Sequence, residues 1–412
     1  MKQKKITIVG TSVYGIENAG DEVLLSVLVR ELRALEPTCH ITWVARHKNE
    51  KLAKEYQCDQ VVVGLEHDTK AASEGRWFNG LNKGDSVEHL HALDAIIRDS
   101  DLLIIGGDPF QEITLSFQRG LASYAAVLIT HAKFVGTPVM LYSIHMGSKL
   151  VTPYAKEITR YCIENANLTT LREAFSLTRL HELAIRTDNC VVVSDTAWAI
   201  NPVSYEHLSP AAKKFFKDAA GKRVVGFNIR HHYWQWSEQE WHEIAGEIAA
   251  FCDHIVEKHD AIILSIPNCT YDTDHKMEDD RPVARDVQKR MKHKTAFHCL
   301  EDRMELNPTL AIFPKLWAHV SNRRHSAVFA AVHHVPVLPL GGSWHVRPAF
   351  DEIGLGRYDI EPEFWSAESL SENFDEVVAR REEIIETIAQ QLPRLRENAI
   401  RQAQLALKVC GA

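Results

Sequence analysis

The sequence has no Cys-x-x-Cys pair, no glycine-rich phosphate loop of the usual spacing and no apolar run long enough to span a membrane. Its eight cysteines are scattered, which predicts reduced, mostly buried thiols and a cytoplasmic protein. The longest apolar stretch, residues 121–142, is interrupted by His131 and Lys133, so no transmembrane segment is expected. Basic residues open the chain, but the apolar run after them is too short for a secretory signal.

Positive charge is not in excess either. The chain of 412 residues has 47 Lys and Arg against 55 Asp and Glu, a net charge of −8, so no nucleic-acid partner is expected. Hydrophobic residues make up 45% and charged residues 25%, which is typical of a globular protein. The length predicts two to three domains.

Short apolar stretches alternate with amphipathic ones along most of the chain. Continuous apolar strands separated by helices indicate parallel sheets that are covered on both faces. The sequence therefore predicts an α/β protein with two Rossmann-like, doubly wound domains that face a cleft. The strands are expected at residues 5–10, 40–45, 61–63, 101–107, 138–146, 168–172 and 190–194, and again at 223–229, 261–266, 294–300, 318–321 and 336–342.

The domain boundaries follow from where this alternation restarts. We expect an N-terminal domain over residues 1–200 and a C-terminal domain over 201–367, because the cycle begins again after Pro202. Residues 368–412 are strongly helical in pattern and are expected to pack back across both domains.

Ligands in open α/β sheets bind beyond the carboxyl ends of the strands, and in the first half polar residues follow several predicted strands. Asn18 and Asp21 stand at a predicted helix start, where they could bind an anion or a sugar, or merely cap the helix. Asp108 follows Gly106-Gly107, and His145 follows the next strand; each could contact a ligand or serve a structural role. Arg172 could bind a ligand or pair with Asp195.

The second half carries the most specific chemical pattern. Arg323 and His325 lie between a predicted strand and a predicted helix, and Arg230 follows another strand. An arginine fork suits a carboxylate or phosphate, and a histidine can donate a proton, but an exposed helix start would show the same pattern. Metal signals are weak: the acidic run at 272–275 is most simply a solvated loop, so neither a metal nor a cofactor is expected.

These segments together resemble the polysaccharide pyruvyl transferase family. The resemblance rests on Asn18-Ala19-Gly20-Asp21-Glu22, on Gly106-Gly107, on Leu171-Arg172-Glu173 with Ser176, and on Arg323-Arg324-His325 followed by Val335-Pro336-Val337. It implies two Rossmann-like domains in a glycosyltransferase-B-like arrangement. It also implies transfer of an enolpyruvyl-derived group from phosphoenolpyruvate to a sugar or sugar-like acceptor, with formation of a ketal.

The resemblance further implies that Arg323 binds the donor and that His325 is the general acid. Arg230 and His345 are additional donor-binding candidates. The N-terminal half would hold the acceptor, with five candidate contacts: Asn18, Asp21, Asp108, His145 and Arg172.

Three positions depart from the family pattern. Asp108 replaces a glycine, Ser148 replaces a proline, and His345 replaces a lysine, which exchanges a fixed cation for a titrating one. Two other functions are compatible with the same two-domain fold: glycosyl transfer from a nucleotide sugar, and non-catalytic binding of a sugar or anion. Retention of both Arg323 and His325 disfavours simple binding, because binding alone needs no proton donor.

Overall fold

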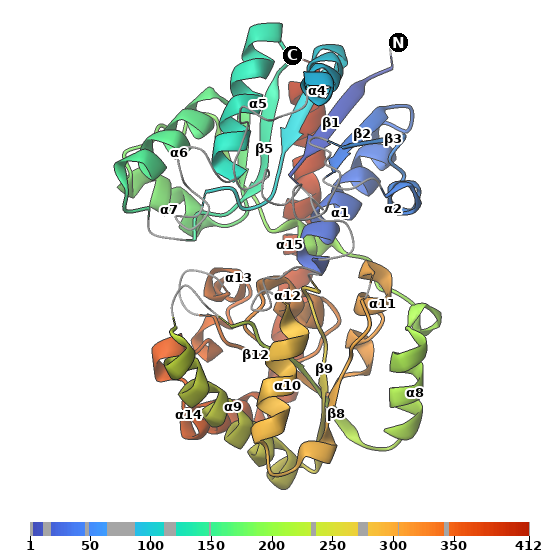
Figure 1. Cartoon of the computed structure of the whole chain (residues 1–412), viewed down its shortest axis with the longest axis vertical. Helices are drawn as coiled ribbons and strands as arrows, with labels where there is room; N and C mark the ends of the chain where they lie inside the picture. Colours follow the sequence, from blue (N-terminus) through green and yellow to red (C-terminus); the bar gives the residue numbers. More distant parts are fainter. Residues whose placement is uncertain are drawn as a thin grey trace. The chain divides into compact units, whose positions relative to one another are not determined.

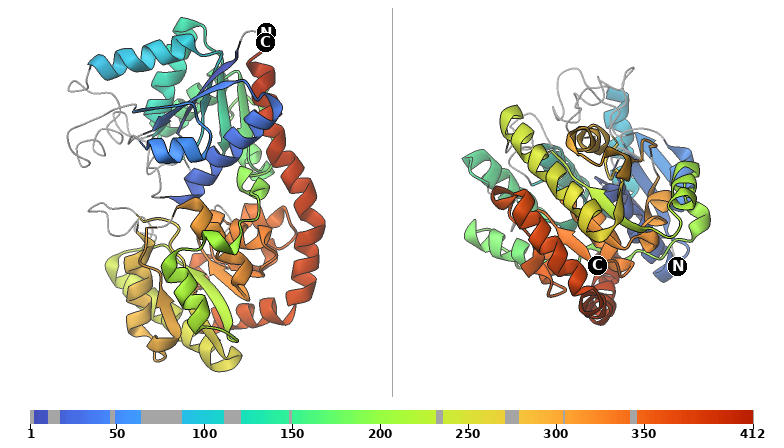
Figure 2. Two further views of the ribbon diagram at one scale, coloured as in Figure 1. Left: turned by 90° about the vertical axis from the view of Figure 1, so that its right-hand side faces the viewer. Right: turned by 90° about the horizontal axis from the view of Figure 1, so that it is seen from below.

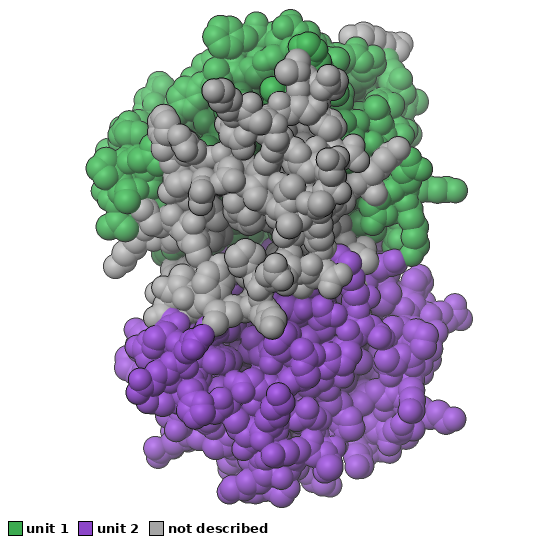
Figure 3. Space-filling model, in the orientation of Figure 1, with its two compact units in different colours: residues 1–15, 21–199, 395–412 green, residues 16–20, 200–394 purple. Residues whose placement is uncertain are grey.

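A computed structural model describes residues 3–10, 18–45, 49–63, 87–110, 121–147, 150–231, 236–270, 279–303, 305–341 and 346–411. The chain forms two compact units, coloured separately in Figure 3. Unit 1 comprises residues 1–15, 21–199 and 395–412, and unit 2 comprises residues 16–20 and 200–394. Each unit contains one parallel β-sheet (Figure 1), so the predicted α/β class is confirmed.

The sheet of unit 1 has seven strands in the order β3-β2-β1-β4-β5-β6-β7. All of its strand pairs are parallel, and the strand order reverses between β1 and β4. Every residue of β4 and β5 is buried, which explains why both segments are almost entirely apolar, with Ser143 as the exception in β5. The strands are β1 (Lys5–Val9), β2 (His40–Ala45), β3 (Gln60–Val63), β4 (Leu102–Ile105), β5 (Val139–Ile144), β6 (Leu168–Leu171) and β7 (Cys190–Val192).

Helices cover both faces of this sheet. Figure 2 shows α4 (Val87–Asp99) and α5 (Leu121–Val135) on one side, and α1 (Ala19–Leu35) with the last turns of α15 (Arg381–Val409) on the other. The remaining helices of this unit are α2 (Glu50–Glu55), α6 (Pro153–Asn165) and α7 (Ala174–Glu182). Helix α6 starts where the sequence dictates, because the Thr152 side chain accepts a hydrogen bond from the Ala155 amide and a proline occupies the first helical position.

The sheet of unit 2 has five strands in the order β10-β9-β8-β11-β12, and all of their pairings are parallel. Here the order reverses between β8 and β11. The strands are β8 (Arg223–Asn228), β9 (Ala261–Ser265), β10 (Phe297–Cys299), β11 (Ala318–Ser321) and β12 (Val337–Pro339). The helices are α8 (Pro210–Asp218), α9 (Glu238–His259), α10 (Asp280–Arg290), α11 (Leu306–Leu310), α12 (Arg324–Val332), α13 (Arg347–Asp351) and α14 (Ala367–Ala379).

The predicted helical C-terminal segment consists of two helices. Helix α14 ends at Ala379 and is capped by Arg380, and α15 begins at Arg381. Residues 381–394 of α15 belong to unit 2, and residues 395–409 belong to unit 1. In unit 1 the buried Gln402 amide donates to the Ser194 carbonyl and accepts from Thr170, which anchors this helix to the sheet.

Three further expectations can be compared with the structure directly. Five of the eight cysteines are buried and the other three are half-buried, so the prediction of mostly buried thiols is confirmed. Among the described helices, none is both long enough and apolar enough to cross a bilayer. The predicted strand at 294–300 is shorter than expected: residues 294–296 form a turn of 3₁₀ helix before β10.

Candidate active site

Two groups of side chains selected from the sequence follow the carboxyl ends of parallel strands, one group in each unit. In unit 2 the group lies where β8 and β11 run side by side, at the reversal of strand order. This is where open α/β sheets bind ligands. Arg230 follows β8, and Arg323 follows β11.

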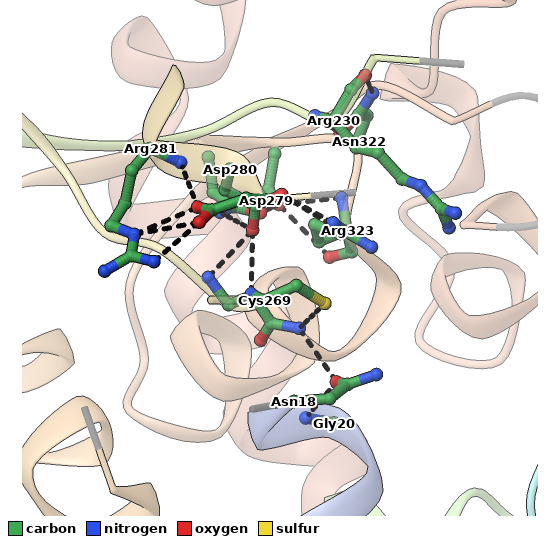
Figure 4. A network of polar contacts seen from close by, with 12 residues as sticks. Asn18, Gly20, Arg230, Cys269, Asp279, Asp280, Arg281, Asn322 and Arg323 are labelled. Atoms are coloured by element: carbon green, nitrogen blue, oxygen red, sulfur yellow. Dashed lines mark hydrogen bonds and ion pairs between the residues drawn. The ribbon is translucent and has the colours of Figure 1, made fainter. Parts of the chain in front are cut away.

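Asn322 joins these two strand ends. The Arg230 amide donates to Asn322 Oδ1 over 2.7 Å, and Asn322 Nδ2 donates to the Arg230 carbonyl over 2.9 Å. This pair of bonds extends the pairing of β8 and β11 by side-chain contacts and fixes the backbone from which Arg230 projects. The Arg230 side chain is half-buried, and Figure 4 shows it pointing away from Asp280.

Arg323 is held by a buried carboxylate (Figure 4). Its Nη2 lies 2.5 Å and its Nε 3.1 Å from Asp280 Oδ1. The other oxygen, Asp280 Oδ2, accepts hydrogen bonds of 2.9 Å from the amides of Asn268 and Cys269, and one of 3.1 Å from Asn228 Nδ2. Arg323 is 7% exposed and Asp280 is 2% exposed, so the guanidinium is fixed in one orientation by a fully hydrogen-bonded anion.

Asp280 was not predicted from the sequence. It stands at the first position of α10, where an acidic residue is commonly only a partner of the helix dipole. Forty-three residues separate it from Arg323, and no local spacing signals the pair. Only the parallel arrangement of β8, β9 and β11 brings the two residues together.

His325 lies in the first turn of α12, against the first residues of α1. A Cβ atom placed on Gly20 would come within 2.3 Å of His325 Nδ1, so only glycine leaves room for the imidazole there. The ring of Phe329 stacks on the imidazole, with centroids 6.3 Å apart and planes 23° apart. His325 is therefore positioned between an aromatic ring and a glycine backbone.

Asn18 also belongs to unit 2, although the sequence placed it with the N-terminal domain. The Asn18 side chain accepts from the Gly20 amide over 2.9 Å, which makes it the cap of α1. Asn18 pairs with Cys269 through the backbone, and the Ala19 amide donates to the Asn268 carbonyl over 3.0 Å. The start of α1 is thus attached to the Asn268–Cys269 segment that also binds Asp280.

The neighbouring His231 is a structural residue. It is 3% exposed and lies among tryptophan rings, with its centroid 4.6 Å from that of Trp241. Burial, together with the nearby Arg230, lowers the pKa of His231 and keeps the imidazole neutral. His345, Ser148 and the acidic run at 272–275 lie outside the described residues.

In unit 1 the corresponding reversal lies between β1 and β4, and two glycines allow their ends to touch. A Cβ on Gly10 would lie 2.5 Å from the Gly106 carbonyl oxygen, and one on Gly107 would lie 2.6 Å from the Gly10 oxygen. Both glycines have positive φ angles, 82° and 87°, which other residues rarely adopt. The close approach of these two glycines places the next residue, Asp108, at the carboxyl edge of the sheet.

Arg172 lies among three carboxylates at this edge. Its Nη2 is 3.0 Å from Asp108 Oδ2, and its Nε is 3.4 Å from Asp195 Oδ2 and 3.7 Å from Glu173 Oε2. The sequence analysis raised the pairing with Asp195 as an alternative to ligand binding, and the structure contains it. Arg172 is 1% exposed, so it acts by fixing Asp108 and not by reaching into solvent.

His145 belongs to the same cluster. Its Nδ1 lies 2.8 Å from Glu173 Oε1, and Ser176 Oγ donates to the same carboxylate oxygen. His145 and Glu173 are each 1% exposed. The structure therefore brings three predicted acceptor residues together, and among them only Asp108 has a partly exposed side chain, at 24%. Asp21, in the first turn of α1, is half-buried and also belongs to unit 1.

Comparison with known proteins matches this arrangement to one family. The model of the polysaccharide pyruvyl transferase family matches residues 18–343, which include both strand-end groups. The chain belongs to the polysaccharide pyruvyl transferase family. It is a transferase, and the resemblance seen in the sequence is confirmed. Among proteins with curated descriptions, none was found to be similar.

Solved structures similar to the transferase share its fold. UDP-GlcNAc 2-epimerase from Neisseria meningitidis, bound to UDP-GlcNAc, is 13% identical with a TM-score of 0.62, covering 98% of this chain and 100% of that one. The epimerase from Methanocaldococcus jannaschii is 13% identical with a TM-score of 0.64, over 98% and 100%. A glycosyltransferase from Rickettsia africae is 10% identical with a TM-score of 0.61, over 99% of both chains. The predicted GT-B-like fold with two Rossmann-like domains is thus confirmed.

Proposed function

We propose that the transferase moves an enolpyruvyl-derived group from phosphoenolpyruvate to a sugar or sugar-like acceptor and forms a pyruvate ketal. The observation that carries this proposal is the pairing of a fixed arginine fork with a histidine at the strand reversal of unit 2. Arg323 is oriented by Asp280, and His325 is oriented by Gly20 and Phe329. This combination supplies an anion contact and a proton donor beside each other in the sequence.

The donor-binding proposal follows from charge and geometry. Phosphoenolpyruvate carries a carboxylate and a phosphate, and guanidinium groups match both. Because a guanidinium has five N–H donors, Arg323 can hold Asp280 and an anion at the same time. The Asp280 carboxylate offsets the charge of Arg323, so the half-buried Arg230 supplies the larger share of the net attraction.

His325 is the proposed general acid. Its proton goes to the methylene carbon of phosphoenolpyruvate, and the resulting cation at the neighbouring carbon is attacked by one acceptor hydroxyl. Phosphate then leaves, and a second hydroxyl closes the ketal ring. The two hydroxyls release two protons, of which one restores His325 and the other leaves with phosphate. An imidazole suits both halves of this exchange, because it can donate a proton and accept one back.

Asp108 is the proposed acceptor contact of unit 1. Arg172 holds one of its oxygens, while the residues behind Arg172 are buried. His145 and Arg172 then act as positioning residues, and neither touches the acceptor. Asp108→Asn should raise the KM for the acceptor and leave donor binding unchanged, which titration of each substrate separately would measure.

Ligand-dependent melting tests this proposal against glycosyl transfer from a nucleotide sugar. A ligand that binds only the folded state raises the melting temperature. We expect phosphoenolpyruvate to raise it and UDP-N-acetylglucosamine to leave it unchanged. If the nucleotide sugar raised the melting temperature and phosphoenolpyruvate did not, the protein would be a glycosyltransferase instead.

A further inference from the structure

Two histidines and an aspartate converge on the surface of unit 2, between α9 and α14. His259 Nε2 lies 2.6 Å and His254 Nε2 lies 3.1 Å from Asp375 Oδ1. The ligand atoms that these three side chains offer all lie within 4.8 Å of one another. The exposed fractions of the side chains are 12% for His259, 29% for His254 and 23% for Asp375, so the cluster is partly open to solvent.

This cluster is remote from the proposed active site within the same unit. Helix α9 starts after the carboxyl end of β8 and ends at His259, two residues before β9 begins at Ala261. His259 therefore stands at the amino ends of the parallel strands, whereas Arg323 and His325 follow the carboxyl end of β11. The cluster does not participate in the chemistry proposed above.

We propose that His254, His259 and Asp375 bind a divalent ion of the zinc class. Two imidazole nitrogens and one carboxylate oxygen are ligands that zinc accepts, and a water molecule would complete four-coordination. Zinc bonds of about 2.0–2.1 Å place tetrahedral ligand atoms roughly 3.3 Å apart. The contact between His254 and Asp375 already has nearly this length, and the contact between His259 and Asp375 has to open by roughly 0.7 Å.

The surroundings of the cluster favour a bound ion. Aromatic rings hold the His259 imidazole, with the centroid of Trp317 at 5.7 Å and that of Phe374 at 5.5 Å. Lys258 Nζ lies 2.6 Å from Asp375 Oδ2, the oxygen opposite to the one that faces His259. A donor on that second oxygen orients a carboxylate ligand. Lys258 is 56% exposed, so its ammonium can return to water at small cost if the ion repels it.

The competing explanation is a cluster held by hydrogen bonds alone, in which both imidazoles donate to Asp375. Zinc titration of the full chain, followed by calorimetry and by melting, separates the two explanations. The wild-type protein should bind one zinc ion tightly and melt at a higher temperature with zinc. His259→Gln and Asp375→Asn should each weaken this binding by at least about 100-fold and abolish the rise in melting temperature.

A second histidine–carboxylate pair supplies the matched control. His293 Nε2 lies 2.8 Å from Glu257 Oε1 on the surface, and this pair has no third ligand among the described residues. His293→Gln should leave zinc binding unchanged. His254→Gln, at the most exposed of the three positions, provides a variant that should stay folded if His259→Gln does not. Zinc binding to His254→Gln with wild-type affinity would overturn the proposal.

Discussion

The contact between Gly20 and His325 leads to a sharp test of the proposed mechanism. In Gly20→Ala the new methyl group would lie 2.3 Å from His325 Nδ1, about 1.1 Å inside the ordinary contact distance of 3.4 Å. The imidazole stacks on Phe329 and must shift by about that amount. A misplacement of about 1 Å in a reacting group can cost roughly 10²-fold in rate, so kcat should fall by about this factor.

The assay is phosphate release from phosphoenolpyruvate in the presence of acceptor, with donor affinity measured separately. Gly246→Ala is the matched control, because Gly246 also lies in a helix and a Cβ there meets nothing within 4 Å. Alanine at that position should stabilise α9 by up to about 1 kcal/mol and leave kcat unchanged. If Gly20→Ala keeps the wild-type kcat while remaining folded, the position of His325 does not matter, and its role as the acid fails.

The remaining predictions concern single groups of unit 2. Arg323→Lys should mainly weaken donor binding, because a point charge cannot replace a fork. His325→Gln should keep donor binding and lower kcat by ~10²–10⁴-fold; loss of folding in both variants, with activity tracking the melting temperature, would argue for structural roles instead. Asp280→Asn should cost about 3–5 kcal/mol of unfolding free energy in denaturant titrations, because it leaves the charge of Arg323 buried without its anion. Burial lowers the pKa of His319 to about 3, so the unfolded state binds the extra proton between pH 6.5 and 3. The unfolding free energy should therefore fall by up to about 1.4 kcal/mol per pH unit as the pH drops through that window, and His319→Gln should flatten this slope.

Much of the fold could be predicted because the strands are buried on both faces. β4 is apolar at every position and β5 is apolar at all but Ser143, and this pattern locates both segments without any knowledge of the rest of the chain. The break at Arg380 was missed, because the helical pattern continues across it and no proline or glycine marks it. Pro393, by contrast, lies within α15 and does not end it.

The sequence predicted those site residues that follow the end of a strand. Asp108, His145 and Arg172 each follow a strand, and parallel pairing brings them to one edge. Which of them is exposed depends on packing, which the sequence does not encode locally.

The proposed zinc site could not be predicted from spacing. Asp375 lies 116 residues from His259, and His254 and His259 are five residues apart, not the three or four that place residues on one helix face.

The sequence did not reveal that Asn18 belongs to unit 2, for a related reason. Sequence order places residue 18 in the first domain, but a backbone hydrogen bond from Ala19 to Asn268 attaches this segment to unit 2. Such long-range backbone pairing leaves no trace in composition or periodicity. It nevertheless places the cap of α1 beside the proposed general acid, so we expect Asn18 to serve the donor group and not the acceptor.

The central claim is that phosphoenolpyruvate is the donor. The direct measurement is incubation of the wild-type protein with phosphoenolpyruvate and a panel of sugar acceptors, following inorganic phosphate and the ketal carbon of the product by nuclear magnetic resonance. We predict that one phosphate is released for each ketal formed and that His325→Gln slows the appearance of both signals by the same ~10²–10⁴-fold factor. Transfer of a sugar from a nucleotide sugar, with phosphoenolpyruvate left unconsumed, would contradict the claim.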